Sequence, residues 1–184
     1  YNQRWYDYTG KNLEQMQGWG WKEVHDPSVL PRVMEQWNES LRTAKPFDMT
    51  FPLRGADGVF RPFLTRINPL TDENQNVIFW FGTNTDLSER VKLEERFRLT
   101  ADAAPVMIWL ADARRTCVWF NRTWLEFTGR KLDEECGDVR LRGVHPDDAD
   151  RYQQTFRDAF DRHESFKIEY RLHRQDGQWR WVLD

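Results

Sequence analysis

The chain has 184 residues, 27 of them basic and 30 acidic, and its formal net charge of −3 offers no positive field for a nucleic acid or an anionic membrane. Its 39% hydrophobic and 15% aromatic content, with 10 Trp and 12 Phe, is too high for a disordered chain. No apolar run approaches the roughly 18 residues of a membrane span. We therefore expect a folded, cytoplasmic segment without nucleic-acid binding or direct membrane insertion, any membrane tether of the parent protein lying outside it.

The first predicted strands form a meander. Apolar and polar residues alternate over 47–53, the pattern of a strand with one buried face. The dipeptide Asp57-Gly58 then predicts a tight turn, because glycine adopts positive φ without steric cost, and a second strand begins at Phe60. A third strand is expected over 77–82.

A linker helix is predicted over 86–100. The segment is rich in Glu, Arg and Leu and contains no Gly or Pro, so it favours one continuous helix about 20 Å long. Leu93 and Phe97 lie four residues apart, with Val91 nearby, and give the helix an apolar edge. This edge is shorter than the several heptads of a self-sufficient coiled coil, so it predicts a weak homodimer.

A second hairpin and a short helix follow the linker. Two apolar stretches within 106–120 flank a polar turn and predict the hairpin. The helix is expected over 121–128, with Trp124 and Phe127 inward and Gly129 as its left-handed cap.

The final elements are a longer helix and a hairpin. The helix begins near Pro146 and places three aromatic residues on one face at spacings of four, namely Tyr152, Phe156 and Phe160. Period-two alternation then predicts strands over 166–172 and 179–183, joined at Asp176-Gly177.

An internal repeat relates the two halves of the chain. A shift of 119 residues aligns identical residues of one segment with those of another, pairing Asn2, Trp5, Thr9 and Gly10 with Asn121, Trp124, Thr128 and Gly129. The same shift aligns Trp37 with Phe156 and the strand 47–53 with 166–172. So long a shift marks two copies of one domain rather than a solenoid unit.

Neither copy is complete by this alignment. The first lacks a counterpart of the hairpin 106–120, and the second lacks a counterpart of the strand 77–81. Two explanations remain open: a trimmed fragment of a longer receptor, or a composite sheet in which 106–120 pairs with 77–81.

Several segments together resemble tandem PAS domains with PAC extensions. They are 18–25, 144–148, the two Asp-Gly hairpins and 82–90, the last being the most specific. The resemblance implies an α+β fold, a five-stranded antiparallel sheet with short helices on one face. It assigns 1–87 to a first PAS/PAC domain lacking its first two strands, 88–100 to the linker helix and 101–184 to a second PAS domain lacking its last strand. The turn at 113–115 departs from the family, which usually turns on a glycine there.

PAS domains of this kind are similar to the sensory modules of bacterial histidine kinases and diguanylate cyclases. The resemblance implies a sensory, relay and dimerisation module that binds a small ligand or relays conformational change to a downstream output domain outside this chain. The alternative is a ligand-free interaction module of a diguanylate cyclase or similar regulator. We expect no enzyme in this segment, because the adjacent acids at 134–135 and 147–148 diverge rather than converge on a substrate.

Aromatic residues of the second copy are the candidates for a ligand pocket. A cavity between sheet and helices would hold a small apolar or aromatic ligand and would be lined by Tyr152, Phe156, Phe166, Ile168, Tyr170, Trp179 and Trp181. Rings at such spacings also form ordinary cores, and the sequence leaves both interpretations open.

No cofactor is identified by the sequence. A flavin-cysteine adduct is not supported, because Cys117 falls on a predicted strand and Cys136 in a loop rather than in the Asn-Cys-Arg-type helix of flavin-binding relatives. Haem ligation is not supported either, since the corresponding helix carries aromatic residues and no His. His25 and His145 have no partners at metal-ligand spacing and are expected to order the turns before their helices.

Overall fold

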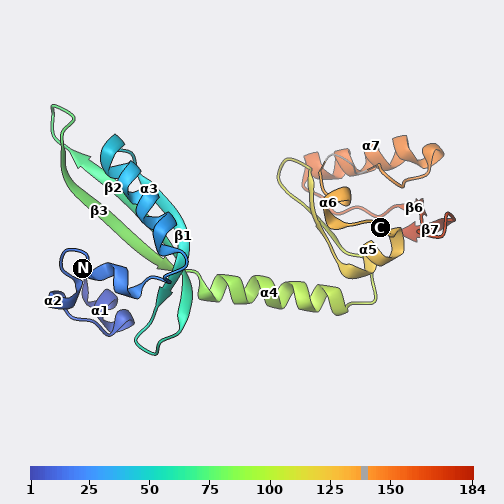
Figure 1. Ribbon diagram of the computed structural model, residues 1–184. Coiled ribbons are helices and arrows are strands. Elements are labelled where there is room, and N and C mark those ends of the chain that lie inside the picture. The colour runs from blue at the N-terminus through green and yellow to red at the C-terminus, as the bar shows by residue number, and fades with distance from the viewer. Residues whose placement is uncertain (138–140) are drawn as a thin grey trace. The chain divides into compact units, whose positions relative to one another are not determined.

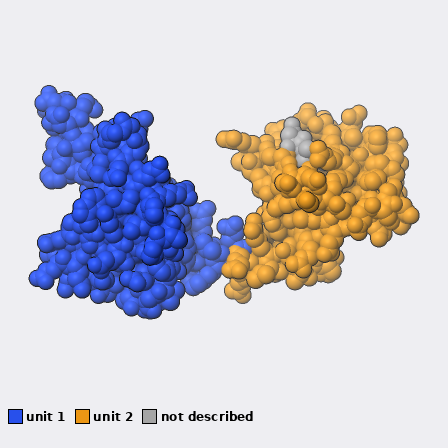
Figure 2. Space-filling view, viewed as in Figure 1, with its two compact units in different colours: residues 1–94 blue, residues 95–184 orange. Residues whose placement is uncertain are grey.

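The structure is a computed structural model that describes residues 1–137 and 141–184. It divides into two compact units, Tyr1–Glu94 (unit 1) and Glu95–Asp184 (unit 2), as Figure 2 shows. Each unit is α+β with antiparallel strands, as predicted (Figure 1). The division falls inside a helix, and the domain limits proposed from the sequence stay a prediction.

Unit 1 combines a three-stranded sheet with short helices. The strands pair in the order β1-β2-β3, which is the predicted meander. The elements are α1 (Gln3–Thr9), α2 (Leu13–Met16), the 3-10 helix η1 (Gly20–Val24), α3 (Leu30–Thr43), β1 (Phe47–Arg54), β2 (Phe60–Thr71) and β3 (Val77–Asp86).

The inner face of this sheet carries the core of unit 1. Along β1, buried and more exposed residues alternate, as expected for a strand with one covered face. The buried residues of β1 form one cluster with Phe63 of β2 and with Trp5, Met16, Val24 and Val33 from the helices. In the antiparallel register, Thr65 lies opposite Asn84 and Phe63 opposite Asp86, so β3 brings polar side chains to the same inner face.

Helix α4 (Ser88–Ala103) confirms the helix predicted over 86–100, within three residues at each end. It begins where β3 ends: Asp86 Oδ1 accepts from the Ser88 N–H at 2.7 Å, and the Leu87 N–H donates to the Pro62 carbonyl. Leu93 is 64% exposed. Phe97 lies against Trp119, with ring centroids 5.5 Å apart.

Unit 2 contains two hairpins and three helices after α4. Both hairpins agree with the predicted strands, and they form separate two-stranded sheets, β4-β5 and β6-β7. The elements are β4 (Trp109–Ala111), β5 (Cys117–Phe120), α5 (Arg122–Thr128), α6 (Leu132–Glu135), α7 (Pro146–Arg162), β6 (Glu169–His173) and β7 (Trp179–Leu183).

The first hairpin of unit 2 turns without glycine. Arg115 adopts a φ of 68° at the position where the family pattern would place a glycine. The register shifts between Leu110 and Ala111, which accommodates the irregular turn. The departure noticed at 113–115 therefore appears as a bulged hairpin.

Asn121 joins α4, the β4-β5 hairpin and α5. Its side chain is fully buried, and its Nδ2 donates to the Ala101 and Val106 carbonyls at 2.8 Å each. Its Oδ1 accepts from the backbone N–H groups of Ile108 and Trp124. Helix α5 ends at Gly129, whose φ of 71° confirms the predicted cap.

Strand β3 pairs with β2 alone among the residues that the structure describes, so these residues hold no composite sheet. Within the same described ranges, no helix is both long enough and apolar enough to cross a bilayer.

Candidate functional site

A large cavity lies in unit 1, between the inner face of the sheet and helices α1, η1 and α3. Its volume is about 1030 Å³, and eight aromatic side chains line it, namely Trp5, Tyr8, Trp21, Trp37, Phe47, Phe51, Phe63 and Trp80. Consecutive residues of β3 from Trp80 to Asp86 also line it, and their side chains alternate between the two faces. The cavity therefore reaches the edge of β3 and is open there.

Aromatic edges and faces form the apolar wall. The ring of Trp37 makes edge contacts with Phe47 at 5.9 Å and with Trp80 at 5.1 Å between centroids. The Tyr8 ring lies 4.7 Å from that of Phe63, and its hydroxyl donates to the Leu53 carbonyl at 2.8 Å. The wall thus offers ring surfaces to an apolar or aromatic molecule.

A polar pair interrupts this wall at the centre of the sheet. Thr65 is 7% exposed, and its hydroxyl donates to Asn84 Oδ1 at 2.5 Å. The hydrogen bond orients the carboxamide, because Oδ1 is engaged and Nδ2 remains to donate. No described residue accepts a hydrogen bond from that Nδ2.

His25 stands in the wall as an uncharged side chain. Its Nδ1 lies 2.9 Å from the Trp21 carbonyl, so this nitrogen carries the proton and donates. Burial lowers the pKa of His25 below its ordinary value. Its ring packs 4.8 Å from Phe51, in keeping with the structural role expected from the sequence.

The pocket candidates from the sequence divide into two groups in unit 2. Tyr152, Phe156, Ile168 and Tyr170 are buried, and Phe166 is half-buried beside Phe156. Trp179 and Trp181 are exposed, at 41% and 66%, and their inclusion was wrong.

Strand register explains the error. Tyr170 pairs with Val182, and Arg171 pairs with Trp181, so Trp181 shares the outer face with Arg171. The guanidinium carbon lies 5.4 Å from the Trp181 ring centroid. Alternation within 179–183 identified residues on one face, but the sequence did not fix which face that was.

A carboxylate occupies the interior of unit 2 beside the buried candidates. Asp184 accepts from Trp109 Nε1 at 3.1 and 3.2 Å and from the Tyr152 hydroxyl at 3.4 Å. Burial raises the pKa of Asp184. By the 119-residue shift, this position corresponds to Thr65 of unit 1.

The cavity residues of unit 1 were missed, although the repeat contained the signal. Subtracting 119 from Phe156, Phe166 and Tyr170 leads to wall residues of unit 1, namely Trp37, Phe47 and Phe51. The sequence analysis placed its pocket in the second copy without transferring those positions to the first.

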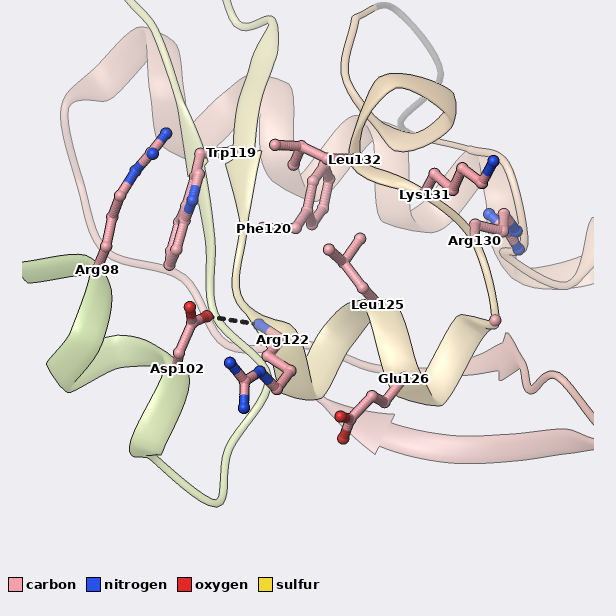
Figure 3. A pocket seen from close by; sticks show the side chains of 11 residues that line it. Arg98, Asp102, Trp119, Phe120, Arg122, Leu125, Glu126, Arg130, Lys131 and Leu132 are labelled. Carbon is pink, nitrogen blue, oxygen red and sulfur yellow. Dashed lines mark hydrogen bonds between the residues drawn. The ribbon is translucent and has the colours of Figure 1, made fainter. Parts of the chain in front are cut away.

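A second, shallower hollow of about 550 Å³ lies in unit 2 among α4, β5, α5 and α6 (Figure 3). Four basic and two acidic residues surround an apolar floor that includes Leu125 and Leu132. Asp102 Oδ1 accepts from the Arg122 backbone N–H at 2.7 Å, the contact drawn in Figure 3. Arg130 is engaged with the buried Glu135 at 2.7 Å. This hollow marks where the end of α4 joins unit 2.

No cluster of three or more metal-ligating side chains occurs in the described ranges 1–137 and 141–184. Burial raises the pKa of Cys136, so its thiol is not activated, and Cys117 is buried on β5.

Comparison with known proteins identifies the fold in both halves. Two family models described as PAS fold match the chain, one over residues 1–92 and the other over 118–184. Protein y4lL of Sinorhizobium fredii, described as uncharacterized, is 36% identical over 188 residues, which cover 98% of this chain and 23% of that protein. The peroxide stress-activated histidine kinase mak1 of Schizosaccharomyces pombe is 28% identical over 198 residues, covering 96% and 12% respectively. The chain thus spans less than a quarter of either relative.

Solved structures include similar domains at low identity. A sensory box histidine kinase/response regulator from Burkholderia thailandensis aligns with 42% of this chain and 60% of its own, at 22% identity and a TM-score of 0.35. A PAS domain from Colwellia psychrerythraea aligns with 45% and 70%, at 18% identity and a TM-score of 0.38. The assignment rests on the two family models, one of which covers half of the chain: the chain belongs to the PAS family.

Proposed function

We propose that this chain is a tandem sensory and relay module of a signal-transduction protein. In this proposal the cavity of unit 1 binds a small apolar or aromatic ligand, and α4 passes the resulting change toward an output domain outside this chain. The chain resembles the PAS sensory domains of histidine kinases, and a histidine kinase is the output that we propose. The segment itself would be non-enzymatic and cytoplasmic.

The observation that carries the proposal is the aromatic cavity. Its volume is about 1030 Å³, enough for a ligand of drug or cofactor size. Trp37 reaches both Phe47 and Trp80 across it, so a bound ring would contact α3, β1 and β3 together. A ligand there would couple the helices to the strand that leads into α4.

Contacts at the two ends of α4 support the relay. At its start, Asp86 and Pro62 bind the first backbone N–H groups; at its end, Asn121 and Asp102 connect the last turn with α5. A displacement of β3 would therefore act on a helix whose far end is hydrogen-bonded to unit 2.

A ligand-free interaction module is the second candidate, and exposed rings on the outer sheet face favour it. Phe79 and Phe81 of β3 are 66% and 63% exposed, and Trp181 of β7 is 66% exposed. Rings in such positions are typical of surfaces that bind another protein.

A thermal-shift experiment separates the two candidates. We expect fractions of cytosolic small molecules to raise the melting temperature of the purified chain, because a ligand that binds only the native state stabilises it by mass action. Trp37→Ala should abolish the shift, and Trp181→Ala should retain it, since Trp181 lies outside the cavity. A shift lost with Trp181→Ala and kept with Trp37→Ala would favour the interaction module.

A further inference from the structure

The ligand class follows from the polar groups of the unit 1 cavity, and the inference rests on the function proposed above. We propose that the cavity binds an uncharged, planar aromatic ligand whose carbonyl or ring-nitrogen acceptor receives a hydrogen bond from Asn84 Nδ2. Nothing in the comparisons assigns a ligand or a binding residue to this chain.

The position of Asn84 is the first step of the argument. The β2-β3 register places it opposite Thr65, on the face that carries Phe63 and Ile67, so the carboxamide projects toward the cavity rather than the outer surface. A polar side chain on an otherwise apolar sheet face gives a ligand one fixed point of recognition.

The hydrogen bond from Thr65 decides which end of the carboxamide is free. Because the hydroxyl occupies Asn84 Oδ1 at 2.5 Å, the amide presents its N–H donors to the cavity. The complementary ligand group is therefore an acceptor, such as a carbonyl oxygen or a pyridine-type nitrogen.

The charges of the wall favour an uncharged ligand. Two ionised side chains line the cavity, Arg4 of α1 and Asp86 at the end of β3, and their charges cancel. His25 adds none, since its Nδ1–H is bound to Trp21 and burial favours its neutral form. A ligand carrying a net charge would lose hydration without gaining a counter-ion.

Unit 2 differs at the equivalent position and would not bind this class. Asp184 replaces Thr65, and its carboxylate is already satisfied by Trp109 Nε1 and the Tyr152 hydroxyl. The donors at this place in unit 2 are therefore engaged within the protein. The inference thus assigns recognition of an acceptor-bearing ring to unit 1.

Three two-ring probes test the proposal by calorimetric titration of the purified chain. Coumarin has a carbonyl acceptor and no charge, naphthalene has no acceptor, and coumarin-3-carboxylate is an anion. We expect coumarin to bind more tightly than either of the others. Asn84→Leu should weaken coumarin about tenfold, the factor expected for loss of one buried hydrogen bond, while naphthalene binding stays the same or improves.

Control variants keep the test specific. Asn68→Leu changes the same residue type on the outer face of β2 and should leave all three affinities unchanged. Asn84→Asp keeps the size of the side chain but replaces its donors with acceptors, so it should weaken coumarin even if Asn84→Leu perturbs the fold.

The outcomes distinguish this inference from the proposed function. If naphthalene and coumarin bind equally and neither Asn84 variant changes their ratio, the cavity binds rings but Asn84 does not select them, which overturns the inference alone. Preference for the carboxylate would also overturn it. If no probe binds, both this inference and ligand binding by the cavity are wrong.

Discussion

Two tryptophans at equivalent repeat positions are buried without using their polar atom. Trp5 and Trp124 are each 8% exposed, and neither indole Nε1 has an acceptor among the described residues. Each packs against the aromatic residue four positions earlier, Tyr1 at 5.1 Å and Phe120 at 5.0 Å between centroids. The rings are therefore held by packing, which is a structural rather than a docking role.

Truncating Trp124 should destabilise unit 2 strongly. We expect Trp124→Ala to cost about 3 to 5 kcal/mol of unfolding free energy, because it removes a buried ring and leaves a cavity. Trp124→Phe should cost less, since the lost indole N–H had no partner. Chemical denaturation measures both. The control Trp181→Ala, at a 66% exposed ring, should change stability little, and an equal loss there would contradict the assignment.

Asp148 should make unit 2 sensitive to acid. Its carboxylate is buried at the start of α7, and hydrogen bonds from the Arg171 side chain and backbone hold its pKa well below the usual range. A lowered native pKa means that the stabilisation is present above the unfolded value of about 4 and is lost as pH falls below it.

The corresponding variant is Asp148→Asn. We expect it to be less stable than the wild type at neutral pH and to show a smaller loss of stability below about pH 4. Melting temperatures recorded across that range check this. Asp158→Asn removes an exposed partner of Gln154 on the same helix and should keep the wild-type acid dependence. Parallel curves for Asp148→Asn and the wild type would refute the role.

At the scale of elements, Asn121 should control the last turn of α4. Asn121→Asp removes the donors to Ala101 and Val106 and places a carboxylate near their carbonyl oxygens, so hydrogen exchange should accelerate in that turn. Asn2→Asp alters the equivalent residue of unit 1, which accepts one hydrogen bond from Trp5 N–H at the start of α1. That control should leave α4 unchanged. Unaltered protection in Asn121→Asp would show that packing alone holds α4.

The apolar edge of α4 gives a test of self-association. Leu93 is 64% exposed, so Leu93→Glu should leave the monomer intact and weaken the proposed homodimer. Sedimentation over a concentration series measures the effect. Leu99→Glu, at a residue 66% exposed and six positions further along the helix, is the matched control on another face. A chain that stays monomeric at millimolar concentration would contradict the dimer itself.

Elements with strong local signals were predicted from the sequence. Gly129 and the Asp-Gly turns require positive φ, which Gly58 and Gly177 adopt at 78° and 82°. Alternation over 47–53 and 166–172 likewise gave the strands. The facing of 179–183 depended on pairing with β6, a contact between strands that local periodicity does not contain.

The cavity lies at a scale that periodicity does not reach. Aromatic residues in unit 2 and unit 1 follow the same pattern, yet unit 2 has a closely packed set and unit 1 an open hollow. The difference depends on how side chains from separate elements fill space, and on which polar residue stands at Thr65 or Asp184. Repeat alignment could have named the positions, but not the empty volume.

Across the whole molecule, each unit should respond to its own core. Separate clusters surround Trp5 and Trp124, and the contact boundary falls between Glu94 and Glu95. We expect Trp5→Ala to accelerate hydrogen exchange in β1 and β2 while β6 stays protected, and Trp124→Ala to do the reverse. Loss of protection in both units from either substitution would show a single cooperative body.

The boundary inside α4 makes residue number a measure of direction. Each residue added to an α-helix turns everything beyond it by 100° and advances it by about 1.5 Å. Seven added residues complete nearly two turns and leave a drift of only about 20°. In a protein of this architecture, lengthening the 16-residue helix by whole heptads would preserve the phase between its ends, whereas one or two extra residues would rotate the downstream fold about the helix axis. Helix length would then be under selection for angle as well as for reach.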